Sequence, residues 1–241
     1  MAEVGSVLIT GAAGVIGRAA AALLAGQGYA LVLADRDVAA VEALAGSLPG
    51  ATWIGGDATD AADVAAMVAK AGAALRCVVL AVGSEGPVGP IEDCDDAAFL
   101  ATMTLNATSV WLGLKAALKV LKPKGRGSIV VLASLSGTMG MPMMSTYSAS
   151  KHAVLGLVRS AAREAAGSGV RINAVCPGPA VSDMMRRIDE GMGRADAAAS
   201  VPMGRYAEPA EIAQMIAFLC SDASSYSTGA SFMLDGGYAC R

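Results

Sequence analysis

A tyrosine and a lysine four residues apart are the side chains in this sequence best suited to proton transfer. Tyr147 and Lys151 have the i, i+4 spacing that places two side chains on one face of a helix, so the ammonium can lie beside the phenol. A nearby cation stabilises a phenolate, and lowering the phenol pKa by about 3 units corresponds to about 4 kcal/mol. Such a phenol is a general acid and base for a ketone and alcohol pair near neutral pH. Ser134 follows an apolar run, where its hydroxyl can bind the substrate oxygen.

A glycine-rich turn near the N-terminus is suited to binding a dinucleotide. Gly11, Gly14 and Gly17 follow an apolar run and open an alanine-rich segment. Glycines let the backbone approach a pyrophosphate, and a helix N-terminus offers it free N–H groups. Asp35 ends the second apolar run, where its carboxylate can accept both ribose hydroxyls of an adenosine and repel a 2′-phosphate, which favours NAD over NADP. A methyltransferase binding an adenosine at such a turn also fits this segment, as does an ordinary turn with a surface acid.

Short apolar runs that alternate with helix-length segments must position these residues. The runs cover residues 7–10, 30–34, 52–54, 77–80, 128–132, 170–175 and 231–234. Near-continuous apolar strands are typical of a parallel sheet covered on both faces. We therefore predict an α/β fold with a doubly wound, seven-stranded parallel sheet, Rossmann-like, in a single domain over residues 1–241. Ligands bind beyond the carboxyl ends of such strands, where the residues named above fall.

Composition excludes several other classes of protein. The 241 residues carry a formal net charge of −3, without the basic face that nucleic-acid binding needs. The hydrophobic fraction of 54% excludes disorder. We find no clean run of about 18 apolar residues and an acid, Glu3, where a signal peptide has positive charge, so we expect a cytoplasmic protein that does not bind membranes. The five cysteines are scattered, which predicts neither a disulfide framework nor a metal site.

Together these motifs resemble the short-chain dehydrogenase/reductase family over nearly the whole chain. They comprise residues 10–17, Asp35, residues 57–60, Asn106, Ser134, Tyr147 with Lys151, residues 173–178 and residues 235–237. The resemblance implies that Tyr147 is the proton donor and acceptor, that Lys151 lowers its pKa and bonds the nicotinamide ribose, and that Ser134 orients the reacting carbonyl or hydroxyl. It also implies that Asn106 holds a water that links Lys151 to solvent.

The resemblance further implies an NAD site whose residues match the family by position. They are Gly11, Ala13, Gly14, Val15, Ile16, Gly17, Asp35, Arg36, Asp57, Ala58, Ala81, Gly83, Tyr147, Lys151, Pro177, Gly178, Ala180 and Ser182. Asp57 is expected at the adenine edge and the Ser182 hydroxyl at the carboxamide. The chain departs from the pattern twice. Val15 stands where the short branch usually has glycine, and Leu80-Ala-Val-Gly83 replaces Asn-Asn-Ala-Gly, which removes two amides that support the cofactor. We expect NAD binding to survive both changes.

Methionines gather in the two regions that border the substrate in this family. One group lies within residues 139–144, and the other lies in an irregular segment whose central part, about residues 179–207, we predict to be a mobile lid. Because methionine fills irregular space, we predict an apolar, adaptable pocket for a small or medium secondary alcohol or ketone. Packing at a subunit contact is the alternative. The predicted substrate residues are Ser136, Met141, Met144, Pro179, Met184 and Met185. The resemblance also implies a homotetramer built on helices at 95–120 and 145–166.

Three functions stay open at this point. The first is an NAD-dependent alcohol dehydrogenase or ketone reductase. The second is an NADPH-dependent reductase of 3-oxoacyl thioesters, because Arg36 directly follows Asp35 and could pair with a 2′-phosphate. The third is a catalytically idle dinucleotide sensor, which has no need of the intact set of Ser134, Tyr147, Lys151 and Asn106.

Overall fold

The computed structural model describes residues 5–194 and 197–240, and within them seven strands form one parallel sheet. The strands are β1 (Ser6–Thr10), β2 (Ala30–Asp35), β3 (Ala51–Gly55), β4 (Leu75–Leu80), β5 (Gly127–Leu132), β6 (Val170–Pro177) and β7 (Ser231–Leu234). Their order across the sheet is β3-β2-β1-β4-β5-β6-β7, and every neighbouring pair is parallel. Each predicted apolar run lies within one strand, so the predicted seven-stranded Rossmann-like sheet is confirmed.

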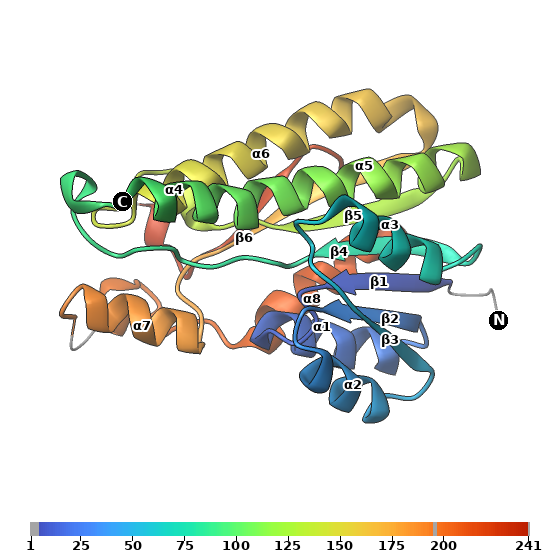
Figure 1. Ribbon diagram of the computed structural model, residues 1–241, viewed down its shortest axis with the longest axis horizontal. Helices are drawn as coiled ribbons and strands as arrows, with labels where there is room; N and C mark the ends of the chain where they lie inside the picture. The colour runs from blue at the N-terminus through green and yellow to red at the C-terminus, as the bar shows by residue number, and fades with distance from the viewer. Residues whose placement is uncertain (1–4, 195–196, 241) are drawn as a thin grey trace.

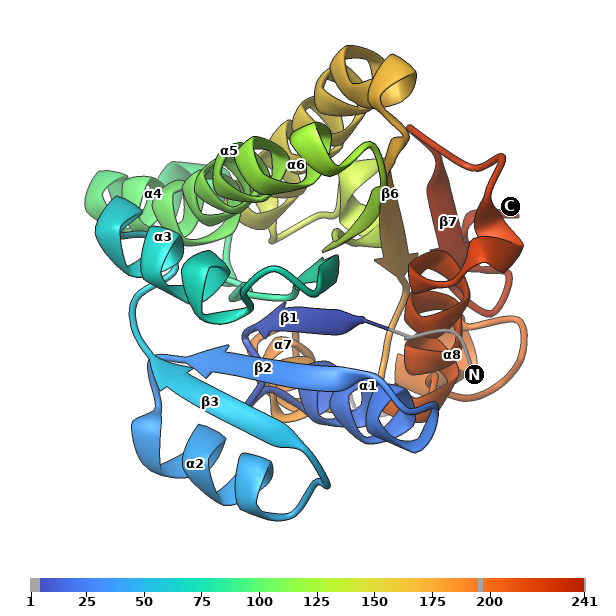
Figure 2. The ribbon, with the colours of Figure 1, turned by 90° about the vertical axis from the view of Figure 1, so that its right-hand side faces the viewer.

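Helices cover both faces of the sheet (Figures 1 and 2). One face carries α3 (Ala61–Lys70), α5 (Ser109–Leu121) and α6 (Ser145–Ala165), and the other carries α1 (Val15–Gly26), α2 (Val38–Gly46) and α8 (Pro209–Cys220). Two further helices, α4 (Asp96–Met103) and α7 (Asp183–Gly191), extend past the carboxyl ends of the strands. This is the doubly wound arrangement that alternating strands and helices predict.

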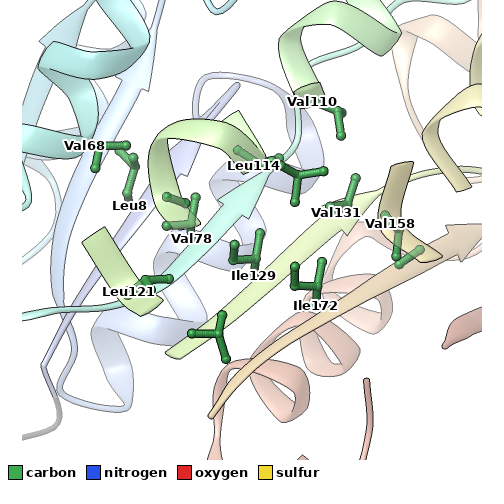
Figure 3. Close-up of a cluster of buried hydrophobic side chains, with 14 of the residues drawn as sticks. Leu8, Val68, Val78, Val110, Leu114, Leu121, Ile129, Val131, Val158 and Ile172 are labelled. Carbon is green, nitrogen blue, oxygen red and sulfur yellow. The ribbon is translucent and has the colours of Figure 1, made fainter. Parts of the chain in front are cut away.

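The core explains why the strands are apolar along their whole length. Figure 3 shows Leu114 of α5 over Val78 and Ile129 of the sheet, Val68 of α3 beside Leu8, and Val158 of α6 beside Ile172. A second cluster on the opposite face joins the other side of the sheet to α1, α2 and α8. Each fully buried valine, leucine or isoleucine contributes roughly 1.5–3 kcal/mol. Packing on both faces of the sheet therefore fixes the positions of the strand ends and of the residues that follow them.

The chain leaves β1 and β4 in opposite directions, and this opens a crevice at the carboxyl edge of the sheet. The two loops that follow these strands touch: a Cβ on Gly11, whose φ is +69°, would lie 2.8 Å from the carbonyl carbon and oxygen of Ala81. Only glycine fits at this approach. Ligands of doubly wound sheets bind at such a switch point.

One long helical segment has the length and composition of a membrane span. Residues Asp96–Lys124 form a 29-residue stretch with a mean hydropathy of 1.3 in its most apolar window. Asn106 and Lys115 interrupt it, so it is not a clean run of about 18 apolar residues, although its mean hydropathy is that of a span. In the fold it packs on the sheet through buried residues such as Val110 and Leu114, as a core helix does.

Candidate active site

An apolar cavity at the carboxyl edge of the sheet brings together most of the predicted site residues. All six predicted substrate residues line it, as do the predicted catalytic residues other than Asn106. The predicted residues in its wall are Ile16, Ala81, Gly83, Ser134, Ser136, Met141, Met144, Tyr147, Lys151, Pro177, Gly178, Pro179, Ala180, Ser182, Met184 and Met185. They come from the loops after β1, β4, β5 and β6 and from α6 and α7, so a ligand here touches residues from most of the chain.

Tyr147 and Lys151 lie on one face of α6, one turn apart. The helix begins at Ser145, so the tyrosine falls in its first turn, at the rim of the sheet. The Lys151 ammonium lies 5.6 Å from the centre of the Tyr147 ring and donates a hydrogen bond of 3.1 Å to the Leu132 carbonyl at the end of β5. Ser134 follows β5 directly, and its hydroxyl accepts a 3.1 Å hydrogen bond from the backbone N–H of Ser136. The structure thus brings together the three side chains that the sequence singles out for proton transfer.

Burial dominates the protonation of this group in the ligand-free chain. It raises the pKa of Tyr147 above the ordinary value of a phenol; a hydrogen bond with Ser134 acts in the opposite direction, and the charge of Glu85 adds to the rise. Burial also lowers the pKa of Lys151 to about 8. The sequence analysis predicted the opposite direction, a phenol made more acidic by Lys151, and burial of the ring is the largest cause of the difference.

Asn106 does not line the cavity with Tyr147, Lys151 and Ser134; it lies in an irregular turn of the long helix. Residues Thr104–Thr108, between α4 and α5, form a π-turn, a feature found often at functional sites. The fully buried Asn106 amide donates to the Ser84 carbonyl and the Ser150 hydroxyl, both at 2.9 Å, and accepts from the Ser84 N–H at 2.9 Å. It therefore ties the loop after β4 to α6. Both of its N–H groups are used, so only its oxygen has capacity left for the predicted water.

Gly83 allows the lysine and the asparagine to approach this loop. A Cβ at Gly83 would lie 3.2 Å from the Lys151 nitrogen and 3.3 Å from the Asn106 side-chain oxygen. Both contacts are tighter than ordinary van der Waals packing, and the atoms concerned are polar. Gly83 is the one residue of the family's Asn-Asn-Ala-Gly pattern that this chain keeps, and it stands where a side chain would crowd the site.

A second groove, on the β2 and β3 side, continues from the cavity. It is lined by Gly11, Ala13, Gly14, Asp35, Arg36, Asp57 and Ala58, and it shares residues 81–83 with the cavity. Two predicted cofactor residues do not line either space. Gly17 lies beneath the turn, and Val15 is 43% exposed at the start of α1. The remaining residues form one continuous trough along the carboxyl edge of the sheet.

The acidic and helical ends of this groove fit the adenosine and pyrophosphate of a dinucleotide. The Asp35 carboxylate accepts hydrogen bonds from the backbone N–H of Ala13 at 2.9 Å and of Asp37 at 3.1 Å, which fixes its orientation. Each oxygen retains a free acceptor position for a ribose hydroxyl. Helix α1 starts at Gly14 without a side-chain cap, whereas Asp37 and Asp60 cap α2 and α3. The first N–H groups of α1 are thus available to an anion, as a pyrophosphate requires.

Asp57 and Ser182 are both engaged by the protein itself. The Asp57 carboxylate accepts from the N–H and the hydroxyl of Thr59, both at 2.8 Å, and these bonds hold its pKa below the ordinary value. The Ser182 hydroxyl caps α7 by accepting from the Met185 N–H at 3.0 Å, and it donates to the Ala180 carbonyl at 3.1 Å. The bond to Ala180 therefore occupies the donor of the hydroxyl predicted for the carboxamide, and the capping role, which the sequence analysis did not foresee, uses its oxygen as an acceptor.

Helix α7 covers the cavity with methionine. Figure 1 shows α7 on the side of the molecule where α6 begins. Met185 and Ile188 pack with Met144 and Tyr147, and Met141 and Met184 join this cluster at its edge. Met203 is 63% exposed and stays outside it. Most methionines of the predicted lid and of its opposite wall thus meet over Tyr147.

Several residues of the cavity region were not among the predicted site residues. Glu85, 7% exposed, is bound by two nitrogens of the Arg187 guanidinium, from α7. Burial alone would raise the pKa of Glu85, but the bonds from Arg187 and Ser84 and its own backbone N–H hold it below the ordinary value. Arg194 and Tyr238 also line the cavity. The two members of the ion pair are 102 residues apart, so no spacing rule connects them.

Three comparisons place the chain among known proteins. A family model described as enoyl-(acyl carrier protein) reductase matches residues 11–239. The chain is 41% identical over 239 residues to a cis-4-hydroxycyclohexanecarboxylate dehydrogenase of Sinomonas cyclohexanicum, covering 96% of this chain and 95% of that one. A crystal structure of a levodione reductase superposes with a TM-score of 0.94 at 32% identity, covering 98% of each chain. A structure of ElxO with NADP bound superposes with a TM-score of 0.91 at 26% identity, covering 98% of this chain and 99% of that one.

The chain belongs to the short-chain dehydrogenase/reductase family. The resemblance inferred from the sequence is confirmed, and with it the class of NAD(P)-binding oxidoreductases that act on hydroxyl and carbonyl groups.

Proposed function

We propose that this protein transfers a hydride between NAD and a secondary alcohol or its ketone, with Tyr147 exchanging the proton. The observation that carries this proposal is the meeting of Tyr147, Lys151 and Ser134 in the wall of an apolar cavity that continues into the dinucleotide groove. NAD bound in that groove supplies the hydride chemistry. The chain supplies the rest: it positions the reacting carbon, excludes water and holds a proton at the Tyr147 oxygen.

Each catalytic side chain has a distinct task in this proposal. In the oxidising direction the Tyr147 oxygen takes the proton of the substrate hydroxyl, and in the reducing direction it returns that proton to the carbonyl oxygen. Ser134 holds the substrate oxygen by a hydrogen bond. Lys151, with a pKa of about 8, can pass a proton onward near neutral pH. Asn106 keeps the loop after β4 against α6, and its free acceptor position can hold the water next to Lys151.

NAD is the cofactor that the groove favours. Asp35 presents a carboxylate whose orientation two backbone N–H groups fix, and a 2′-phosphate at that place meets a like charge. Arg36 lines the same groove and is the observation that favours the second candidate, an NADPH-dependent reductase of 3-oxoacyl thioesters. The ratio of the dissociation constants for NADH and NADPH, measured by fluorescence titration, separates the two. Tighter binding of NADPH argues for the second.

The substrate proposed here is apolar around its reacting carbon. Met144, Met185 and Ile188 supply soft, adaptable walls next to the phenol. The relative that is 41% identical is named for a hydroxycyclohexanecarboxylate, which carries a secondary alcohol on a six-membered ring. A ring of that size with a hydroxyl or carbonyl group is the substrate that we propose to test first.

The decisive experiment replaces Tyr147 with phenylalanine, which removes the phenolic oxygen and keeps the ring. We expect kcat to fall by roughly 10²–10⁴-fold, the range for loss of a general acid or base. The dissociation constant of NADH, from fluorescence titration, should stay within about threefold, because the groove is untouched. Tyr226→Phe, at a fully exposed tyrosine, is the matched control. Turnover by Tyr147→Phe at the wild-type rate refutes the mechanism, and wild-type NADH binding without turnover of any alcohol or ketone points to a dinucleotide sensor.

We also propose a homotetrameric, cytoplasmic protein with a lid over residues 179–207. The long helix through α4 and α5 leaves apolar side chains on the surface of the single chain, among them Phe99, Leu100 and Trp111. Such a face favours burial against another copy of the chain. Sedimentation at micromolar concentration tests the tetramer, and Trp111→Glu should shift the protein to smaller species.

A further inference from the structure

Arg194 has a buried hydrogen-bond donor for which the described residues supply no acceptor. The residue follows the end of α7, lines the same cavity as Tyr147, and its side chain is 29% exposed. Its terminal nitrogen Nη2 donates to the Asp189 carboxylate at 2.8 Å. Its Nε is buried and has no hydrogen-bond partner among the residues that the structure describes. An unsatisfied buried N–H carries a penalty that native structures rarely accept without a purpose.

The neighbours of Arg194 hold it in place. Asp189 accepts from Arg194 through one carboxylate oxygen and from the Tyr206 hydroxyl, at 2.6 Å, through the other. The backbone N–H of Arg194 also donates to the Asp189 carbonyl at 2.9 Å. The guanidinium is thus anchored at one nitrogen, whereas an arginine carries five N–H donors in a planar fork. The remaining donors are preorganised for a second acceptor.

The other two arginines on this segment are occupied. Arg187 uses Nε and Nη2 on the buried Glu85, and Arg186 pairs with Glu190 and Asp183 on the outer face of α7. Of these three, Arg194 is the one that lines the cavity, and its buried Nε has no partner among the described residues. The described residues of the substrate side are otherwise mostly apolar, which makes a ligand the acceptor to test for Arg194.

We propose that Arg194 binds a carboxylate of the substrate, so that the substrates are hydroxy or oxo carboxylic acids. In this class an apolar ring or chain separates the acid group from the reacting carbon. This inference rests on the proposed function and assigns its substrate class. A planar carboxylate matches the fork of a guanidinium, and the bond is assisted by charge. Because Asp189 already balances the charge of Arg194, recognition depends on the oriented donors more than on net attraction. The sequence analysis predicted an apolar pocket and left an anionic substrate possible but not indicated, and the acid group is the refinement.

The test compares 4-oxocyclohexanecarboxylate with its methyl ester as substrates for reduction with NADH. The wild type should prefer the acid, and Arg194→Met should lower kcat/KM for the acid by roughly tenfold to hundredfold, the value of a hydrogen bond to a charged group. It should leave kcat/KM for the ester within about threefold. Arg194→Lys, which restores a cation beside Asp189, should recover part of the preference. Arg186→Met is the matched control and should leave the ratio of acid to ester unchanged.

Equal losses for acid and ester in Arg194→Met, or a wild type that reduces the ester at least as well as the acid, overturn the carboxylate site. A merely structural role for Arg194 gives equal losses for both compounds. Calorimetry with cyclohexanecarboxylate, which has no hydroxyl or ketone to react, supplies a readout that does not need turnover. Binding that weakens at least tenfold in Arg194→Met supports the site even if the wild type reduces neither ketone, a result that would count against the proposed function alone. Binding that is absent, or the same in both proteins, contradicts the site.

Discussion

The cofactor half of the groove and its substrate half differ in what fixes their walls. In the cofactor half, backbone lies against backbone, as at Gly11 and Ala81, and the Asp35 carboxylate is held by backbone N–H groups. In the substrate half, side chains hold side chains, as in the pair of Glu85 and Arg187. Backbone contacts tolerate almost no substitution, whereas side-chain contacts can be exchanged one at a time. The first half suits a ligand that never changes, and the second can adapt to new substrates without disturbing the first.

The strongest way to break the cofactor half is Gly17→Ala. The added Cβ would lie 2.3 Å from the Gly11 carbonyl oxygen and 2.9 Å from the Ala12 Cα, and backbone atoms cannot rotate away. We expect a loss of about 3 kcal/mol in the free energy of unfolding, measured in urea, and loss of NADH binding. Alanine is by itself the better helix former, so a loss reports the clash.

Gly14→Ala is the control for this change, because its Cβ would meet only the Gly11 oxygen, at 3.4 Å. It should unfold as the wild type does. An equal loss of stability in both variants contradicts the view that backbone contact at Gly17 fixes the turn.

Asp35→Ser should change which cofactor the same half accepts. It removes the charge that repels a 2′-phosphate and leaves Arg36 in the groove. We expect the ratio of the NADPH and NADH dissociation constants to move toward NADPH by roughly tenfold to hundredfold, the value of one or two hydrogen bonds to a charged group. Asp60→Ser is the control, since Asp60 caps α3, does not line the groove and should affect stability alone. An unchanged ratio in Asp35→Ser removes the basis for preferring NAD.

Arg187→Met should perturb the substrate half alone. It leaves the Glu85 carboxylate buried without its cation, which costs roughly 1–3 kcal/mol. The free energy of unfolding should fall by about that amount and KM for the substrate should rise, whereas the NADH dissociation constant stays the same. Adding Glu85→Gln should restore part of the stability, because the uncompensated charge is gone. A large loss of NADH affinity in Arg187→Met would show that the two halves are not independent.

The smallest expected effect is on the pH dependence of stability. The pKa of Lys151 is about 8 in the folded protein and near its ordinary 10.5 in the unfolded chain. Above pH 8 the unfolded chain therefore binds more protons, and stability rises with pH. We expect this rise, on the order of 1 kcal/mol per pH unit at most, between pH 8 and 9 in the wild type and not in Lys151→Met. At higher pH the raised pKa of Cys176, about 11, works in the other direction.

Urea unfolding at several pH values measures this slope. The exposed Lys115→Met should behave as the wild type does. Parallel slopes in the wild type and Lys151→Met would mean that the burial of this lysine does not govern the slope.

The same contrast explains what could be predicted from the sequence. The strands could be predicted because burial on both faces of the sheet requires continuous apolar runs. The cofactor half could be predicted because glycine spacing and an acid at the end of a strand are local patterns in the sequence. The partnership of Glu85 with Arg187, and the capping role of Ser182, depend on the folded path of the chain. The direction of the Tyr147 pKa shift was missed for a related reason: helical spacing reveals a neighbouring cation but not the depth of burial, which dominates.

The π-turn at Thr104–Thr108 has a consequence for anyone engineering this protein. Its wider loop holds one residue more than a regular helix would, and the amide of Asn106 reaches both Ser84 and Ser150 from there. Deleting one residue in the turn would restore standard helical bonding, yet it would rotate the preceding helix by about 100° relative to the rest. Regularising this helix to raise thermostability would therefore break the link that Asn106 makes between the loop after β4 and α6, so the turn should be left as it is.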